Sequence, residues 1–171
     1  CWVGRNPFVE VMPRFATELG KMGFMTIFDE GTAKGITAFG DAYTFEPDLQ
    51  AFQELKQEGK LNQHIVVYFG GNLATAELTP VATLLEWWDG HDLPGHKAVK
   101  IGMDGALESI SAPVIDGFAD PKNVAAPVIS AEPLAKYLAE LDAAGFQVKI
   151  HAIGDESVRA TLDGYESVIT A

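Results

Sequence analysis

Two kinds of hydrophobic pattern alternate along the chain. Four short runs rich in β-branched and aromatic residues predict β-strands, at residues 24–30, 64–69, 98–104 and 146–154. The run HIVVYF at residues 64–69 is almost continuously apolar, which is typical of a strand buried on both faces of a parallel sheet. Apolar residues at helical spacing predict helices from Phe8 to Met22, from Pro47 to Gly59, from Thr79 to Trp88, from Ser130 to Gly145 and from Asp155 to Tyr165.

Alternating strands and helices predict an α/β fold with a parallel sheet and right-handed crossovers. An open doubly wound sheet would carry a glycine-rich phosphate loop after its first strand, and FDEGTAKG at residues 28–35 lacks that G-x-G-x-x-G form. A TIM (β/α)8 barrel instead places functional side chains at the C-terminal ends of its strands. Polar residues occupy such ends in this sequence: Asp29, Glu30, Lys100, Asp104, His151 and Asp155.

The chain is too short for a complete barrel. A full TIM barrel takes about 250 residues, whereas this sequence has 171 residues and four predicted strands. We therefore expect a single partial (β/α)-barrel domain over residues 1–171, about half of a TIM barrel. The sequence begins with Cys1 instead of methionine, which suggests that it starts inside a longer reading frame.

Charge and hydropathy exclude several partners. Twelve basic and 24 acidic residues give a net charge of −12, which repels nucleic acid and anionic membranes. The sequence holds no apolar run of about 18 residues and no visible secretory signal. We expect a cytoplasmic protein.

Strand alternation directs Lys100 and His151 to one face of the sheet, toward the barrel interior. Two other interpretations remain open: His151 could be a core histidine bonded to a neighbouring backbone, and Lys100 could pair with Asp104 or Glu30. Asp104 and Gly105 are expected to form a turn. Asp155 is expected to cap the helix that follows it. His91 and His96, in the loop GHDLPGH, are either solvated or part of a metal-binding loop.

Two segments resemble a known family. VKIGMDGALES at residues 99–109 and GFQVKIHAIGDESV at residues 145–158 are similar to the amidohydrolase superfamily, in its amidohydrolase 3 branch related to N-substituted formamide deformylases. That branch has the patterns V-K-x-x-x-D-G-(S/A)-L and A-G-F-Q-V-x-x-H-A-I-G-D-x-A-V. More loosely, MGFMTIFDE at residues 22–30 resembles the branch's strand pattern G-I-T-S-V-x-D.

The resemblance implies a metal-dependent hydrolase in which this chain supplies strands two to five of the barrel. Lys100 then corresponds to a strand-four lysine that can be carboxylated to bridge two divalent ions, and His151 to a strand-five ligand of the second ion. Zinc, as one or two ions, suits these ligands. A metal-activated water would hydrolyse a non-peptide, amide-type C–N bond of a small molecule.

The sequence also departs from the family. It lacks the His-x-His of strand one, the histidine of strand six and the aspartate of strand eight, and His64, His91 and His96 occupy no family position. We expect the isolated chain to bind metal weakly or not at all and to be inactive. Lys149 should point inward beside His151, where its ammonium opposes a metal ion unless it meets a carboxylate such as Asp29.

A second hypothesis remains. The chain could be a non-catalytic half-barrel that binds a protein partner or forms homodimers or larger oligomers. Exposed sheet edges and an uncovered barrel interior favour such contacts.

Overall fold

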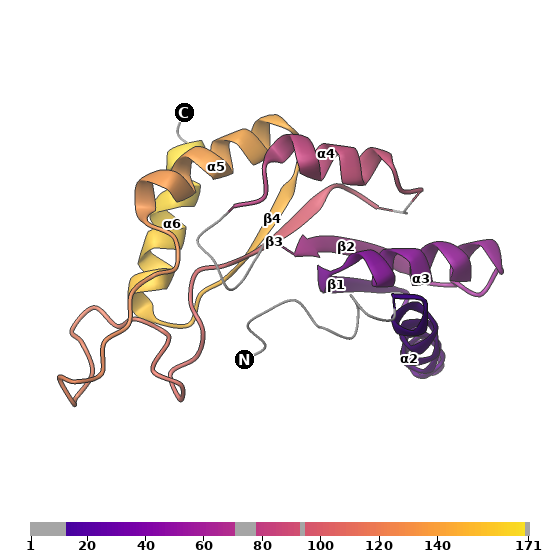
Figure 1. Ribbon diagram of the computed structural model, residues 1–171, viewed down its shortest axis with the longest axis horizontal. Helices are drawn as coiled ribbons and strands as arrows, with labels where there is room; N and C mark the ends of the chain where they lie inside the picture. The colour runs from indigo at the N-terminus through magenta and orange to yellow at the C-terminus, as the bar shows by residue number, and fades with distance from the viewer. Residues whose placement is uncertain (1–12, 71–77, 93–94, 170–171) are drawn as a thin grey trace.

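The fold is a four-stranded parallel sheet covered by helices, as the sequence predicts (Figure 1). The computed structural model describes residues 13–70, 78–92 and 95–169. The strands lie in chain order: β1 (Ala38–Thr44), β2 (His64–Gly70), β3 (Ala98–Gly102) and β4 (Gln147–His151). The helices are α2 (Pro13–Ala33), α3 (Glu46–Gln57), α4 (Val81–Asp89), α5 (Ala131–Ala143) and α6 (Asp155–Ile169).

One face of the sheet packs against the helices and forms the core. On β2, Ile65, Val67 and Phe69 alternate toward this face and are at most 1% exposed. The same core contains residues of β3 and of α3, α4 and α5, among them Val99, Ile101, Leu49, Phe52, Leu84 and Leu138. This hydrophobic layer fixes which residues of each strand face the opposite, inner side.

The inner face of the sheet carries small and polar residues. Strand pairing places Gly70 of β2 opposite Lys100 of β3, and Lys100 opposite Lys149 of β4. β1 contributes Ala38, Gly40 and Ala42 to this face, all exposed. In a closed barrel this face would line the interior.

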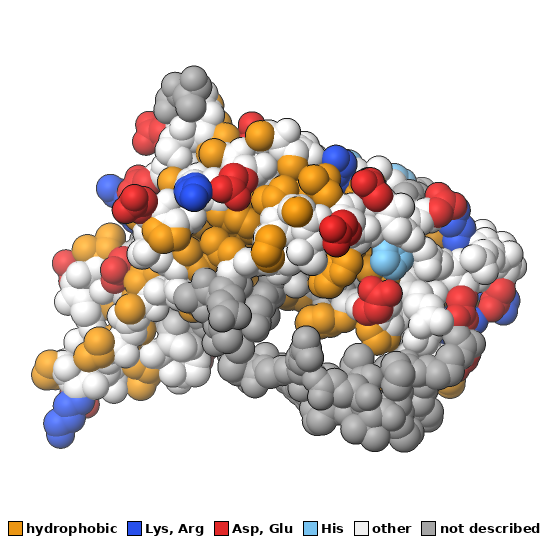
Figure 2. All heavy atoms as spheres, turned by 45° about the horizontal axis from the view of Figure 1, so that its top comes forward, with side chains coloured by type: hydrophobic (Ala, Val, Ile, Leu, Met, Phe, Trp, Pro, Cys, Tyr) orange, Lys and Arg blue, Asp and Glu red, His pale blue; other side chains and the backbone are white. Residues whose placement is uncertain are grey.

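The surface combines apolar and acidic areas. In Figure 2, hydrophobic side chains gather in the middle of the visible face, with acidic side chains around them. Within the described ranges, no helix has both the length and the apolar composition of a membrane span.

Most predicted elements are confirmed. The strands predicted at residues 64–69, 98–104 and 146–154 correspond to β2, β3 and β4, and the helices predicted after Pro47, Pro80, Ser130 and Gly154 correspond to α3, α4, α5 and α6. The predicted first helix begins at Phe8, and residues 8–12 lie outside the described ranges.

The strand predicted at residues 24–30 is wrong, because these residues belong to α2. Phe24 and Phe28 are four residues apart, stack with ring centroids 6.1 Å apart, and both contact Phe52 of α3. Residues four apart lie on the same side of an α-helix, so both rings can reach Phe52. In a strand the two rings would also share a face, but the strand would hold them farther apart along its axis. Asp29 and Glu30 therefore lie on a helix and not at a strand end.

The first strand is instead β1, whose sequence AFGDAYT has a weak strand pattern. Gly35, with φ of +77°, ends α2, since the Ile36 N–H donates to the Gly31 carbonyl just after the last helical turn. The segment GITAFGD at residues 35–41 fits the pattern G-I-T-S-V-x-D better than MGFMTIFDE does. The looser part of the resemblance therefore belongs to β1 and not to residues 22–30, which the sequence predicts.

Candidate functional site

Lys100 and His151 lie on the same face of two adjacent strands. β3 and β4 pair in parallel with Lys100 opposite Lys149 and Gly102 opposite His151. Because residues two apart on a strand share a face, His151 shares the face of Lys149 and hence of Lys100. The geometric expectation from the sequence is confirmed. The role of the two residues as metal ligands stays a prediction.

Lys100 is buried at 7% exposure. Its Nζ lies 5.0 Å from the centre of the Tyr43 ring. Burial, helped by the positive charge of Lys149, lowers the pKa of Lys100 to about 8, although Asp104 acts in the opposite direction. A buried lysine with this pKa holds part of its amine neutral near physiological pH.

The predicted ion pairs of Lys100 do not form. Among the described residues no carboxylate lies within 4.0 Å of its Nζ. Glu30 lies on α2, 4.0 Å from the Nζ of Lys34, and Asp104 bonds to backbone N–H groups of another loop. The interpretation of Lys100 as half of a salt bridge is therefore wrong.

The imidazole of His151 is held by one of its two nitrogens. Nε2 lies 2.7 Å from the carbonyl oxygen of Gly105 and 3.5 Å from Oδ1 of Asp104. Both neighbours accept hydrogen bonds, so Nε2 carries the proton and Nδ1 keeps its lone pair. The backbone bond is the one expected of a core histidine, and metal-ligating histidines also make it with their second nitrogen.

Asp104 is a buried hydrogen-bond acceptor. Its side chain has no exposed surface and accepts N–H bonds from Ile153 at 3.0 Å and from Gly154 at 2.8 Å. The turn expected at Asp104 and Gly105 lies farther along, at residues 107–110. That part of the prediction is wrong, because the Asp104 carboxylate accepts hydrogen bonds from the loop after β4 and not from its own loop.

Asp155 also differs from its predicted role. It is the first residue of α6, and its Oδ1 accepts the N–H of Ile115 at 2.9 Å. It therefore ties the loop after β3 to α6 instead of capping its own helix.

Lys149 points away from His151. Its Nζ lies 3.8 Å from the centre of the Tyr68 ring, and a Cβ placed on Gly40 would be 3.6 Å from it. The pairing proposed with Asp29 is wrong, because Asp29 lies on α2. The ammonium reaches across β3 toward β2 and β1, so it does not stand beside the imidazole.

Tyr43 is a site residue that the sequence pattern missed. It occupies a bulge at the end of β1, with φ of +67°, and Thr44 takes the helix-side position opposite Phe69. Its ring lies near Lys100, and a Cβ on Gly70 would be 3.1 Å from Cδ1 of the ring. The hydroxyl is buried with no partner among the described residues, and burial raises the pKa of Tyr43 to about 12. Regular alternation assigns Tyr43 to the other face.

The loop histidines do not form a metal site in the structure. Nδ1 of His91 donates to the Trp87 carbonyl at 2.6 Å, and Nε2 of His96 contacts Oε1 of Gln147. Across the described ranges no three His, Cys, Asp or Glu side chains gather closely enough to hold an ion. The metal-loop interpretation of GHDLPGH is wrong for these two residues.

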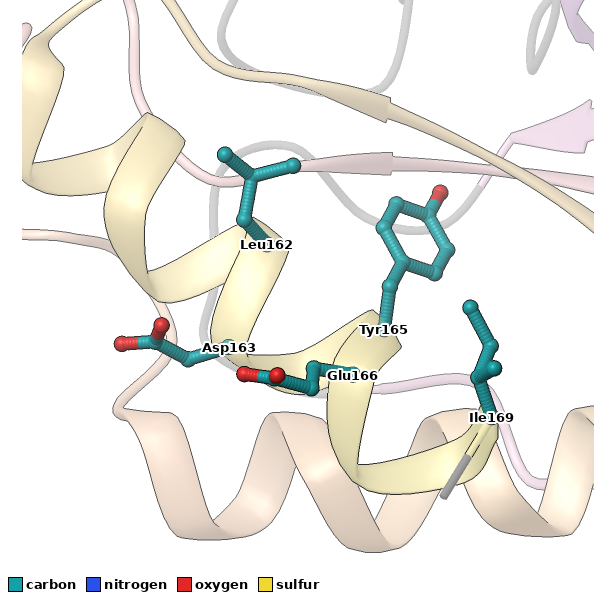
Figure 3. A pocket seen from close by; sticks show the side chains of 5 residues that line it. All are labelled: Leu162, Asp163, Tyr165, Glu166 and Ile169. Carbon is teal, nitrogen blue, oxygen red and sulfur yellow. The ribbon is translucent and has the colours of Figure 1, made fainter.

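A pocket of about 410 Å³ lies elsewhere, on α6. Figure 3 shows Leu162, Tyr165 and Ile169 rising from one side of the helix, with Asp163 and Glu166 beside them. The Tyr165 hydroxyl donates to the carbonyl of Val148 at 3.1 Å. Neither Lys100 nor His151 lines this pocket, so it is separate from the inner-face site.

Known proteins match both the sequence and the fold. A family model described as "Amidohydrolase family" matches residues 4–171. The protein LONG AFTER FAR-RED 3 of Arabidopsis thaliana is 42% identical over 74 residues, which are 43% of this chain and 13% of that protein. The exoenzymes regulatory protein AepA of Pectobacterium carotovorum subsp. carotovorum is 29% identical over 133 residues, which are 76% of this chain and 28% of that protein.

Two solved structures share the fold. An uncharacterized metal-dependent hydrolase from Pyrococcus horikoshii OT3 superposes with a TM-score of 0.70 at 22% identity, over 88% of this chain and 31% of its own. One from Pyrococcus furiosus gives a TM-score of 0.65 at 24% identity, over 87% and 31%. The chain thus spans less than a third of the length of these relatives. With nearly all of its residues matched by the family model, the chain belongs to the amidohydrolase family.

Proposed function

We propose that this chain forms part of a metal-dependent hydrolase, with Lys100 and His151 as two of its metal ligands. The observation that supports this most directly is the placement of both side chains on one face of adjacent strands, with His151 at the end of β4 and Lys100 two residues before the end of β3. Family membership and structural neighbours described as metal-dependent hydrolases agree with it.

The chemistry of the two donors fits a divalent ion, although the set is incomplete. The Nδ1 lone pair of His151 is left over once Nε2 has bonded to Gly105, and neutral imidazole nitrogen is a good zinc ligand. Catalytic zinc normally has three protein ligands, and the described residues offer these two. We therefore expect weak binding by the chain alone and propose one or two zinc ions for a complete protein.

We propose that Lys100 acts in a carboxylated form. Its neutral amine, favoured by burial, can attack the carbon of carbon dioxide. The new N–C bond then yields a carbamate, and the amine releases one proton to solvent. The product is an anionic oxygen ligand, which suits a divalent ion better than an ammonium does.

The proposed reaction is hydrolysis of an amide-type, non-peptide C–N bond in a small molecule. A bound divalent ion lowers the pKa of water to near neutrality and polarises a carbonyl. The chain's own residues would orient the site: the Gly105 carbonyl fixes His151, and the Tyr43 ring lies against the Lys100 side chain. The Tyr43 hydroxyl, which is buried with no hydrogen-bond partner among the described residues, would donate to a substrate oxygen that reaches it.

A zinc titration of the 15N-labelled chain, followed by NMR, tests this proposal. We expect the imidazole signals of His151, assigned by their absence in His151→Gln, to shift, with the change at Nδ1. His96→Gln is the matched control and should leave this shift unchanged. Zinc that perturbs His64, His91 or His96 but not His151 would contradict the proposed ligand.

The second candidate function is self-association. Leu162 and Ile169 on α6 are 58% and 83% exposed, and they line the pocket in Figure 3. Apolar surface of this kind favours a protein partner, such as a second copy of the chain. Light scattering of Leu162→Glu would show a smaller mass than the unmodified chain. Val124→Glu, at a position 80% exposed in the loop between β3 and α5, is the control.

A further inference from the structure

Two loops at the end of β3 and β4 are joined by a set of contacts that we name the loop clasp. It connects residues 104–115, after β3, with residues 151–155, which begin at the last residue of β4. Its hydrogen bonds are those of Asp104 with the N–H groups of Ile153 and Gly154, of His151 with the Gly105 carbonyl, and of Asp155 with the Ile115 N–H.

The clasp encloses His151 on both sides along the chain. Asp104 directly precedes Gly105, whose carbonyl accepts the hydrogen bond from Nε2 of His151. The Asp104 carboxylate also accepts the N–H groups of Ile153 and Gly154, which follow His151 in the chain. A movement of either loop would therefore move the imidazole relative to its acceptor. The Asp104 carboxylate lies between these parts, because it directly precedes Gly105 in the chain and bonds to the two residues that follow Ala152.

The two oxygens of Asp104 have different neighbours, and Oδ1 is the one beside the imidazole of His151. Oδ2 of Asp104 accepts the N–H groups of Ile153 and Gly154, and its Oδ1 lies 3.5 Å from Nε2 of His151, whose own N–H donates to the Gly105 carbonyl. An Asn side chain with its oxygen at the position of Oδ2 would keep both backbone bonds, but it would place an NH2 donor at the position of Oδ1, beside Nε2 of His151.

The charge of Asp104 is balanced without a salt bridge. In the described part of the chain no lysine or arginine lies within 4.0 Å of it, and its side chain is fully buried. Gly154 directly precedes α6, so the N–H groups that bind the carboxylate lie at the positive end of that helix. The structure thus keeps a buried anion next to the imidazole with backbone groups alone.

We propose that Asp104 is a positioning residue, which holds His151 in the Nε2–H tautomer with Nδ1 directed away from the clasp as the free nitrogen. The importance of this tautomer for a metal ion rests on the proposed function. The tautomer itself belongs to the metal-free chain and can be tested without any ion.

The test is a long-range 1H–15N correlation spectrum of the imidazoles, with His151 assigned through His151→Gln. In the unmodified chain we expect His151 to show one protonated nitrogen, Nε2, and one unprotonated nitrogen, Nδ1. In Asp104→Asn we expect the averaged signals of two tautomers. Asp155→Asn is the matched control, because it makes the same change at a clasp carboxylate that does not reach His151, and it should keep the single tautomer.

Amide hydrogen exchange gives a second measurement on the unmodified chain, which does not depend on a variant that folds. The N–H groups of Ile153 and Gly154 should exchange slowly, although both lie outside the strand ladder. An Nδ1–H tautomer in the unmodified chain, fast exchange at both amides, or an unchanged tautomer in folded Asp104→Asn would each overturn the proposal. Zinc binding has no part in these outcomes, so they are independent of the proposed function.

Discussion

The two halves of the sheet are held together by different forces. Around α2, α3 and β1, aromatic rings pack on one another, with Phe24 and Phe52 only 4.3 Å apart between centroids and Phe28 and Phe39 at 5.7 Å. At the ends of β3 and β4, buried polar groups meet backbone donors and acceptors instead. Ring packing tolerates small shifts, whereas hydrogen bonds fix direction. The half with directional contacts is the one that contains Lys100 and His151.

The largest effect is expected from the aromatic half. Phe52→Ala should lower the free energy of unfolding by about 3–5 kcal/mol, because it removes a ring that is 1% exposed and contacts Phe24 and Phe28. Chemical denaturation measures this. Phe45→Ala, where the side chain is 58% exposed, should change it by less than about 1 kcal/mol. Similar losses in both variants would show that the rings do not form the core of this half.

A pair of glycine substitutions compares the halves directly. Gly154→Ala should cost about 1–3 kcal/mol, because the new Cβ would overlap the carbonyl oxygen of Pro113 and come within 2.8 Å of its N and C atoms. Gly23→Ala should be neutral or stabilise by up to about 1 kcal/mol, since no atom lies within 4 Å and alanine favours the helix. Thermal unfolding of both variants gives the difference, and equal midpoints would contradict close packing in the clasp.

The change of the free energy of unfolding with pH measures the effect of burying Lys100. Its pKa is about 8 in the folded chain and 10.5 ordinarily, so between these values the unfolded chain binds more protons and stability rises with pH. Below pH 8 both states are protonated, and the unfavourable burial of the charge is constant.

Lys100→Met should therefore remove a rise of about 1–3 kcal/mol between pH 8 and 10.5. The measurement is urea denaturation at several pH values. Lys122→Met, at an exposed position, should retain the rise of the unmodified chain. A rise that persists in Lys100→Met would assign it to another group.

The sequence by itself determined the elements with strong local patterns. The run at residues 64–69 is apolar enough to be buried as β2 wherever it packs, and strand alternation alone puts Lys100 and His151 on a common face. Capping and breaking residues such as Pro47 and Gly145 bound α3 and α5 within one or two positions. These features depend on neighbours in the chain, so a single sequence contains them.

Only the tertiary structure decided the rest, because the deciding contacts join residues far apart in the chain. Residues 24–30 have a strand-like composition, but they are helical in the structure, where Phe24 of α2 packs against Phe52 of α3. Asp104 bonds to Ile153 49 residues away, Asp155 bonds to Ile115 40 residues away, and Lys149 meets Tyr68. Local propensity cannot specify a contact partner at such separations, because that partner depends on how the whole sheet and its helices pack together.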